Sequence, residues 1–549
     1  MTAELHDPVR GYSDPDRLWT TTNVAEATPD ILTPLCWSVF GDGMERAWLD
    51  SMGAFGVLGA SEREISDDPN KRAAAAVLGR QAVNIAVLRR VVARLPGVHP
   101  DDVERDIFGS VRAGIPEEPG APRRIPVILV KLPMAMLGID RHINAMYADQ
   151  LRWWRSEIFD SSAGSRSAAD AMARLDESHR RFAVAMSLHH RSRFLLSAAE
   201  KPVVDAFTRI GRPEDARDLL SAYGGVAETG MADAMYAVAR AELSMTEFLR
   251  EYGFHGPNEG NVYTRSWREE PHRVNALVAG YRNRSDLRRP REQEAEAMRV
   301  RAARQSELMA TLPGRARPAV KFAWARAGGM TRKLELGKAA YLMALDGARA
   351  AARELGAALA ADGVLADADD TFFLTVPELG DLTARRIEPA RAQALAAYRR
   401  EQRALYQRIT MPLTWTGFPD VDFLVRQAAD KPANDYSTSL VRGVAWGGGT
   451  VTGRARVVRS PHEDVELEAG DILVCRFTDP SWAPLFSMAE ALVIDIGGAQ
   501  SHGAVVAREL GIPYVIGTDN GTDLIREGAV ITVNGTNGDI TVVADRTLA

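Results

Sequence analysis

The residues best suited to chemistry lie near the C-terminus, where an apolar run ends in two glycines and a histidine follows. Residues 491–496 have the length and composition of a buried strand, and Gly497 and Gly498 end it. Ser501 is a typical helix N-cap, and the apolar residues that follow it, closed by a glycine and a proline, predict a helix. His502 is therefore expected at or near the first helical position.

A histidine at the start of a helix is suited to phosphoryl transfer. The free backbone N–H groups and the positive end of the helix dipole can hold phosphoryl oxygens. The same positive end disfavours imidazolium, so the neutral ring of His502 keeps a nitrogen free to attack phosphorus. We assign His502 to catalysis and Gly497, Gly498 and Ser501 to phosphate binding. The alternative is a histidine that only caps a surface helix.

The surrounding segments closely resemble the swivelling phosphohistidine domain of the phosphoenolpyruvate-utilising enzymes, which include phosphoenolpyruvate synthase, pyruvate phosphate dikinase and rifampicin phosphotransferase. Besides the histidine string, the resemblance rests on Gly453-Arg-Ala-Arg-Val457, Gly470-Asp-Ile-Leu-Val474, Thr478-Asp-Pro-Ser-Trp482 and Val533-Asn-Gly535. It implies that His502 carries the phosphoryl group and that the last domain moves between two sites.

Composition excludes several function classes. The chain has 549 residues, enough for several domains, and 46% of them are hydrophobic, which favours a globular protein. The net charge is −6, so no overall basic field points to nucleic acid or to a membrane surface. The arginines of residues 282–304 alternate with glutamates, which is typical of a solvated helix.

The two cysteines, Cys36 and Cys475, form neither a disulfide framework nor a metal-binding spacing. We therefore expect no metal site and a reducing, cytoplasmic location. The N-terminal residues do not resemble a signal peptide, and we find no apolar run of about 18 residues, so we expect neither secretion nor a membrane span.

These site residues must be positioned by two kinds of domain. Helical periodicity dominates residues 44–429, with helices expected over residues 71–95, 167–198, 227–252, 333–361 and 389–409. Short β-branched segments then alternate with glycine-rich turns, which predicts a small α/β domain. We predict a large mainly α-helical acceptor-binding domain over residues 1–430, a hinge over 431–449 and the α/β swivelling domain over 450–549.

The most informative central stretch is residues 248–271, where a loop follows a helix. His255 could accept the proton of an acceptor hydroxyl, with Glu259 or a backbone group fixing its tautomer, or could simply satisfy a loop carbonyl. The stretch resembles the acceptor-binding domain of rifampicin phosphotransferase. It departs from that family at Phe254-His255 and Ser266-Trp267, where the family has His-Arg and Arg-Trp, so two family arginines are missing.

A second resemblance to rifampicin phosphotransferase lies in residues 18–38, an expected loop that enters a helix. Asn23 and Glu26 match an Asn-x-x-Glu pattern of its antibiotic-binding domain, which implies substrate binding, although the segment could equally be a strap over the core. Trp37 and Trp267 are suited to the aromatic walls of a pocket, or to a core.

A third match concerns Lys338. With Glu335 it fits the family's Arg-Glu-x-x-Lys element, although Leu334 replaces the arginine. A lysine beside the transferred group would neutralise developing charge; the alternative is a plain surface lysine.

The resemblance also implies an ATP-grasp domain that phosphorylates the histidine, and we find neither this domain nor a phosphate loop in the chain. We therefore expect a separate ATP-grasp partner subunit that binds ATP and Mg²⁺. The main hypothesis is the acceptor subunit of a two-component aryl-phosphate synthase, which phosphorylates a phenol or cresol. The alternatives are a rifamycin-like antibiotic phosphotransferase subunit and a non-catalytic phosphocarrier or regulatory protein.

Overall fold

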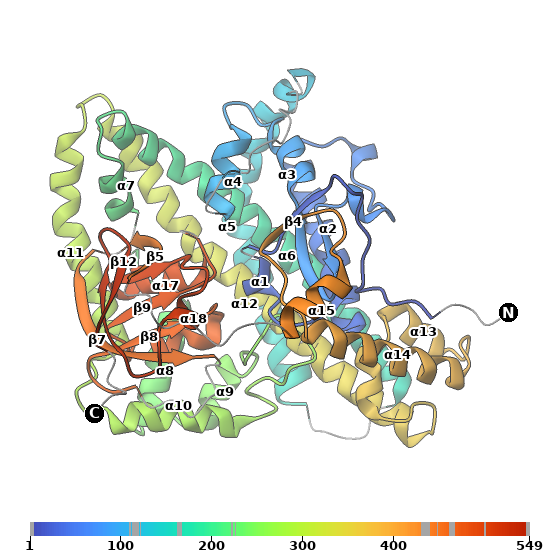
Figure 1. Cartoon of the computed structure of the whole chain (residues 1–549). Helices are drawn as coiled ribbons and strands as arrows, with labels where there is room; N and C mark the ends of the chain where they lie inside the picture. Colours follow the sequence, from blue (N-terminus) through green and yellow to red (C-terminus); the bar gives the residue numbers. More distant parts are fainter. Residues whose placement is uncertain are drawn as a thin grey trace.

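The computed structural model describes residues 5–22, 24–108, 111, 120, 122–161, 167–220, 223–225, 227–429, 440–446, 448–459, 467–498 and 501–544. Within these ranges the chain forms a large, mainly helical part and a small C-terminal α/β domain, as predicted (Figure 1). No described helix is both long and apolar enough to cross a membrane.

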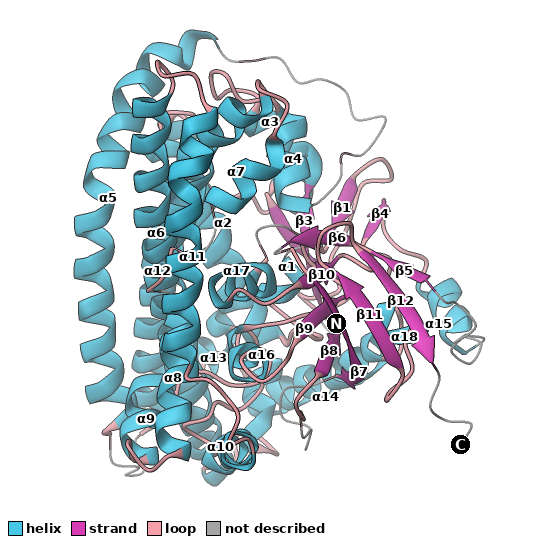
Figure 2. Cartoon of the chain, turned by 90° about the vertical axis from the view of Figure 1, so that its left-hand side faces the viewer, coloured by secondary structure: helices cyan, strands magenta, loops and turns pink. Residues whose placement is uncertain are grey.

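The helical part is built on four long helices: α2 (Pro34–Ala54), α5 (Ile125–Trp153), α6 (Ala168–Thr208) and α12 (Arg317–Ala361). They form one layer in Figure 2, in which α6 and α12 run side by side. Small residues permit this close packing, because a Cβ at Gly347 would lie only 2.8 Å from Ser178 Oγ. Alanines of α12 fill the core beside Phe182 and Tyr341, whose rings meet edge to face. Helices α6 and α12 together therefore support the side chains that α12 contributes to the site.

A four-stranded sheet adjoins α2, with the order β2-β3-β1-β4. Its strands are β1 (Leu18–Thr20), β2 (Ala74–Val77), β3 (Arg80–Asn84) and β4 (Thr414–Thr416). The helix predicted over residues 71–95 is therefore wrong in its first half, and only α3 (Ile85–Val92) is helical there. Leu78 and Gly79 both have positive φ, 48° and 72°, which turns the chain into the β2–β3 hairpin.

Further helices, most of them shorter, complete the helical part. They are α1 (Val24–Ala27), α4 (Pro100–Phe108), α7 (Pro213–Leu219), α8 (Ala227–Ala239), α9 (Met245–Tyr252), α10 (Pro271–Asn283), α11 (Pro290–Thr311), α13 (Val376–Thr383), α14 (Pro389–Gln407) and α15 (Val421–Ala429). The helix predicted over residues 227–252 is divided at Ala241, whose φ is 59°. The basic stretch forms most of α11, where Arg299 pairs with Glu296, as expected for a solvated helix.

The C-terminal domain is an eight-stranded sheet with the order β5-β12-β11-β7-β8-β9-β10-β6. Its strands are β5 (Leu440–Arg442), β6 (Val444–Trp446), β7 (Thr450–Val458), β8 (Asp471–Cys475), β9 (Ala491–Ile494), β10 (Tyr514–Ile516), β11 (Val530–Asn534) and β12 (Asp539–Ala544). Strands β7 to β10 are parallel. The helices are α16 (Ala483–Phe486), α17 (His502–Leu510) and α18 (Gly521–Leu524). Residues 431–439 of the predicted hinge lie outside the described residues, and the sheet begins at Leu440.

The two parts share a hydrophobic core. Figure 2 shows α16 and α17 between the sheet and the layer of long helices. Trp482, Leu485 and Phe486 of the C-terminal domain pack with apolar residues of α8, α9 and α10. At this boundary the hydroxyl of Tyr281 donates to the carbonyl of Pro484 at 2.8 Å. The C-terminal domain is therefore docked on the helical part through an apolar face.

Candidate functional site

The turn from β9 to α17 carries the predicted phosphohistidine. His502 is the first residue of α17, and Ser501 is its N-cap with φ −68° and ψ 161°. Gly511 ends the helix in the left-handed conformation, with φ 69°. The structure describes the backbone of His502 and not its side chain, and residues 499–500 lie outside the described residues. The start and the end of the helix are as predicted.

Gly497 brings this turn close to the helical part. Its φ is 152°, and a Cβ there would lie 2.9 Å from both Ser501 Oγ and Glu26 Oε1. A side chain at this position would therefore be strained and would clash. Since Glu26 belongs to α1, the N-terminal segment reaches the glycine turn. Two predicted site residues far apart in sequence, Glu26 and Gly497, are thus neighbours.

Two buried hydroxyls flank the N-terminus of α17. Ser501 is 2% exposed and Thr478 is fully buried, and neither hydroxyl oxygen has a hydrogen-bond partner among the described residues. Thr478 Oγ1 would lie 2.8 Å from a Cβ on Gly503, the residue after His502. Buried hydroxyls without a partner are rare and, beside free backbone N–H groups, suit the oxygens of an anion. Thr478 is a candidate phosphate ligand that the sequence prediction did not include.

Asp495 fastens the turn to the sheet. Its carboxylate accepts hydrogen bonds from Thr518 Oγ1 at 2.7 Å and from the backbone N–H of Thr522 at 3.1 Å. Burial raises the pKa of this carboxyl, whereas the two threonines lower it. The exposed Arg476 follows β8 nearby and also lowers it. These groups meet at the carboxyl ends of parallel strands, where ligands commonly bind in α/β sheets.

The loop between α9 and α10, residues 253–270, is the central loop. His255 Nδ1 lies 2.7 Å from Glu259 Oε2, and both side chains are buried. The pair has the geometry of a base oriented by a carboxylate, and the role of His255 as a base stays a prediction.

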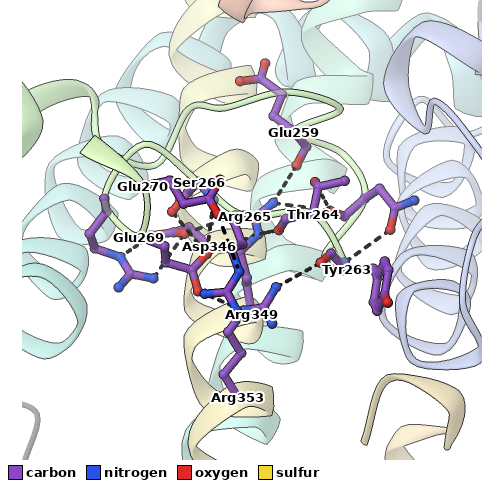
Figure 3. A network of polar contacts seen from close by, with 12 residues as sticks. Glu259, Tyr263, Thr264, Arg265, Ser266, Glu269, Glu270, Asp346, Arg349 and Arg353 are labelled. Carbon is purple, nitrogen blue, oxygen red and sulfur yellow. Dashed lines mark hydrogen bonds and ion pairs between the residues drawn. The ribbon is translucent and has the colours of Figure 1, made fainter. Parts of the chain in front are cut away.

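Arg349 of α12 holds the central loop from below (Figure 3). Its guanidinium is 1% exposed and donates to the carbonyl oxygens of Thr264 at 2.6 Å, Glu259 at 3.2 Å and Asn261 at 3.3 Å. It also pairs with Asp346 at 3.0 Å. Burial alone would raise the pKa of Asp346, but Arg268 and Arg349 hold it below its usual value. The charged core of this network is therefore fully paired and rigid.

The central loop also contacts the C-terminal domain. The backbone N–H of Asn258 donates to Asp479 Oδ2 at 3.0 Å. Asp479 belongs to the Thr478-Asp-Pro-Ser-Trp482 segment, next to the start of α17. Burial, and then the charge of Glu259, raises the pKa of Asp479 to about 8. The turn that carries His502 and the loop that carries His255 thus belong to one interface.

Lys338 lies in a separate buried cluster on α12. Its ammonium group pairs with Glu228 of α8 and lies 3.1 Å from Glu335 Oε2. Burial lowers the pKa of Lys338, but the two carboxylates outweigh burial and raise it above its usual value. Burial and the neighbouring Glu228 raise the pKa of Glu335 to about 8. Lys338 is therefore a half-buried, charged lysine and not a plain surface residue.

The remaining predicted residues are dispersed. Trp267 is fully buried in the core shared by the two parts, so it cannot form a pocket wall. Trp37 lines a cavity of about 610 Å³ between α2, α6 and α13, together with residues such as His179 and Asp176. This cavity includes none of the other predicted site residues. Asn23 lies outside the described residues.

Two models of known families match parts of the chain. Residues 467–538 match the family described as PEP-utilising enzyme, mobile domain, and residues 212–333 match the rifampicin phosphotransferase fourth domain. The resemblance expected from the sequence is confirmed: the C-terminal domain contains a mobile domain of the PEP-utilising enzymes.

Similar proteins include phosphotransferases. A rifampicin phosphotransferase of Streptomyces sp is 41% identical over 183 residues, which cover 33% of this chain and 20% of the relative. That of Bacillus subtilis (strain 168) is 37% identical over 180 residues, with the same shares. The uncharacterized phosphotransferase YvkC of that strain is 29% identical over 309 residues, 54% of this chain and 36% of the relative. The alignments thus span only a fifth to about a third of these relatives.

Among solved structures, that of Enzyme I, determined by NMR, aligns with 70% of this chain and 83% of that chain. The identity is 11% and the TM-score 0.15, too low to support an inference.

Proposed function

We propose that this chain transfers a phosphoryl group from His502 to a hydroxyl group of a small-molecule acceptor. The main support is that a domain matching the mobile domain of the PEP-utilising enzymes, with His502 at the start of α17, contacts through Asp479 the central loop that carries the His255–Glu259 pair. Phosphoryl transfer needs mainly positioning and charge stabilisation. The helix N-terminus, Ser501 and Thr478 supply donors for the phosphoryl oxygens.

In the proposed transfer, the acceptor oxygen attacks phosphorus while the P–N bond to His502 breaks, and the electron pair returns to the imidazole. The hydroxyl proton passes to His255, and Glu259 stabilises the resulting imidazolium. Lys338 would stabilise the charge on the transferred group. Because Lys338 is paired with Glu228, its positive charge would act from a fixed position within this cluster.

The acceptor we favour is a rifamycin-like antibiotic. The named relatives act on rifampicin, and the match to a rifampicin phosphotransferase domain covers part of the helical region. The comparisons therefore support the antibiotic alternative above the phenol or cresol acceptor that the sequence first suggested. The family arginines missing near His255 remain a reason to test small phenols in parallel.

For the phosphoryl donor we propose ATP with Mg²⁺, bound by an ATP-grasp module as partner. The described residues contain no group of three His, Cys, Asp or Glu side chains that could hold a metal ion. We therefore assign no residue of this chain to the metal or to the nucleotide.

The test separates loading of His502 from transfer. Phosphoramidate, which can phosphorylate an imidazole nitrogen with release of ammonia, loads the purified chain without any partner, and ³¹P NMR detects the acid-labile adduct. Rifampicin, phenol and p-cresol are then added separately. We expect loss of the adduct and a phosphate ester with rifampicin.

A matched control is His272→Ala, because His272 is an exposed histidine in the first turn of α10. It should load normally, whereas His502→Ala should not. An adduct that persists in His502→Ala would refute the central proposal. A loaded chain that transfers to protein but to no alcohol would instead support the phosphocarrier alternative.

A further inference from the structure

The carboxylate of Asp479 joins the two parts of the chain at the site. Within its own domain it accepts hydrogen bonds from the backbone N–H of Ser481 at 2.9 Å and from the Ser481 hydroxyl. From the helical part it accepts the N–H of Asn258. Asp479 is only 1% exposed, so this contact is made without competing bulk water.

The peptide of Asn258 is held from both sides. Its carbonyl accepts the N–H of Asn261 at 2.8 Å and the hydroxyl of Thr264 at 3.1 Å, both within the central loop. Its N–H is held by Asp479 alone among the described residues. Asn258 has a φ of 50°, a left-handed conformation that an outside contact helps to maintain.

The residue after Asn258 is Glu259, which orients His255. The position of Glu259 is therefore set by Arg349 at its carbonyl and by Asp479 through the preceding amide. Arg349 belongs to the helical part and is always present. Asp479 is present only while the C-terminal domain is docked.

We propose that Asp479 is a positioning residue that orders the His255–Glu259 pair only when the domain carrying His502 is docked. This inference rests on the proposed function, because it takes His255 as the proton acceptor. In the undocked state the Asn258 amide would face water, and the pair would lose one of its two anchors. Docking of the domain that carries the phosphoryl group would thus complete the orientation of His255 as the base.

Charge around Asp479 gives this link a pH dependence. Glu259 is the charged group facing Asp479, with His255 and Tyr341 beyond it. Because the docked pKa of about 8 lies above the usual Asp value near 3.8, docking takes up a proton. The contribution of Asp479 to docking is complete below about pH 4. It is lost as pH rises toward about 8.

The experiment uses the full chain and three variants. Asp479→Ala removes the acceptor of the Asn258 amide, and Asp479→Asn keeps an acceptor but cannot ionise. Ser481→Ala is the matched control, since Ser481 contacts Asp479 only within its own domain. Hydrogen exchange of the peptide containing Asn258 measures docking, and phosphoramidate-loaded chain with rifampicin measures transfer between pH 6 and pH 9.

We expect Asp479→Ala to exchange the Asn258 amide about tenfold faster and to transfer about tenfold more slowly, with normal loading of His502. Asp479→Asn should retain protection, and its transfer should lose the decline as pH approaches 8. Ser481→Ala should keep the wild-type protection of the Asn258 amide, and its decline in transfer should move to higher pH, because the Ser481 hydroxyl lowers the pKa of Asp479. Wild-type exchange and pH profile in Asp479→Ala would overturn the inference.

The two proposals fail in different ways. If the wild-type chain loads phosphate on His502 but transfers to no hydroxyl, the proposed function fails. The exchange of the Asn258 amide then decides alone whether Asp479 orders the loop, and an unchanged rate in Asp479→Ala rejects that role.

Discussion

Glu509, in the last turn of α17, accepts a hydrogen bond from the backbone N–H of Gly224 at 2.7 Å. The helix that begins at His502 is therefore fastened to the helical part at its far end. Asp479 makes the corresponding contact near the first end. Two carboxylates of the C-terminal domain thus bind two backbone amides of the helical part, and together they fix the direction of α17.

The Glu509 contact predicts that docking of the C-terminal domain at the far end of α17 depends on pH. Burial raises the pKa of Glu509, so its contribution to docking is present below the usual value near 4.5 and is lost as pH rises through the docked value. Glu509→Ala should weaken docking by about 1–2 kcal/mol, and Glu509→Gln by less. Exchange of the Gly224 amide measures both. Equal protection of the Gly224 amide in the wild type and in both variants would exclude a role of Glu509 in docking.

Gly497 should tolerate no side chain. Gly497→Ala combines strained φ with contact to Ser501 and Glu26, and should lower the free energy of unfolding by about 1–3 kcal/mol. Gly528→Ala is the control, because Gly528 has φ 81° but nothing within 4 Å of an added Cβ. Thermal unfolding of both variants separates strain from crowding. Equal losses would mean that the close approach of Ile516, Glu26 and Ser501 costs nothing.

Arg349 should be essential for the central loop. Arg349→Lys cannot reproduce four fixed contacts, and it leaves Asp346 with weaker pairing, so the loss should be about 3 kcal/mol. The control is Arg386→Lys, at an exposed pair with Asp381. Chemical denaturation compares the two. A change in Arg349→Lys as small as in the control would show that the network is not needed for stability.

The Lys338 cluster predicts a rescue by double substitution. Lys338→Met leaves the buried Glu228 without its cation and should cost about 3 kcal/mol of stability. Adding Glu228→Gln should restore most of that loss, because the buried charge is removed. Under the proposed function, transfer from phospho-His502 should stay low in both. Recovery of transfer in the double variant would contradict a role for the Lys338 charge.

The local signals of the C-terminal domain were sufficient to predict its α/β class and the start of α17, but not β5 and β6, which lie within the predicted hinge over residues 431–449. Ser501, the glycine pair and Gly511 act over a few residues, and the structure obeys them. The same holds for His255 and Glu259, which are four residues apart in one loop. Local sequence chemistry is most reliable where both partners are close in the chain.

Long-range relationships could not be predicted. Residues 74–84 are rich in alanine and look helical, but they pair with β1 and, through it, with β4, which lies more than three hundred residues later. Tertiary pairing outweighs helix propensity there. Thr478 and Asp479 likewise show their role only once the C-terminal domain is placed on the central loop.

The core shared by the two parts determines what movement of the C-terminal domain would require. Leaving this position would expose Trp482, Leu485 and Phe486, with their partners on α8 to α10, to water. Apolar surface of this kind does not remain solvated at low cost. Once undocked, the C-terminal domain would therefore have to bury this apolar face against a second protein surface. It would pass directly from one docked position to the other and spend little time free in solvent.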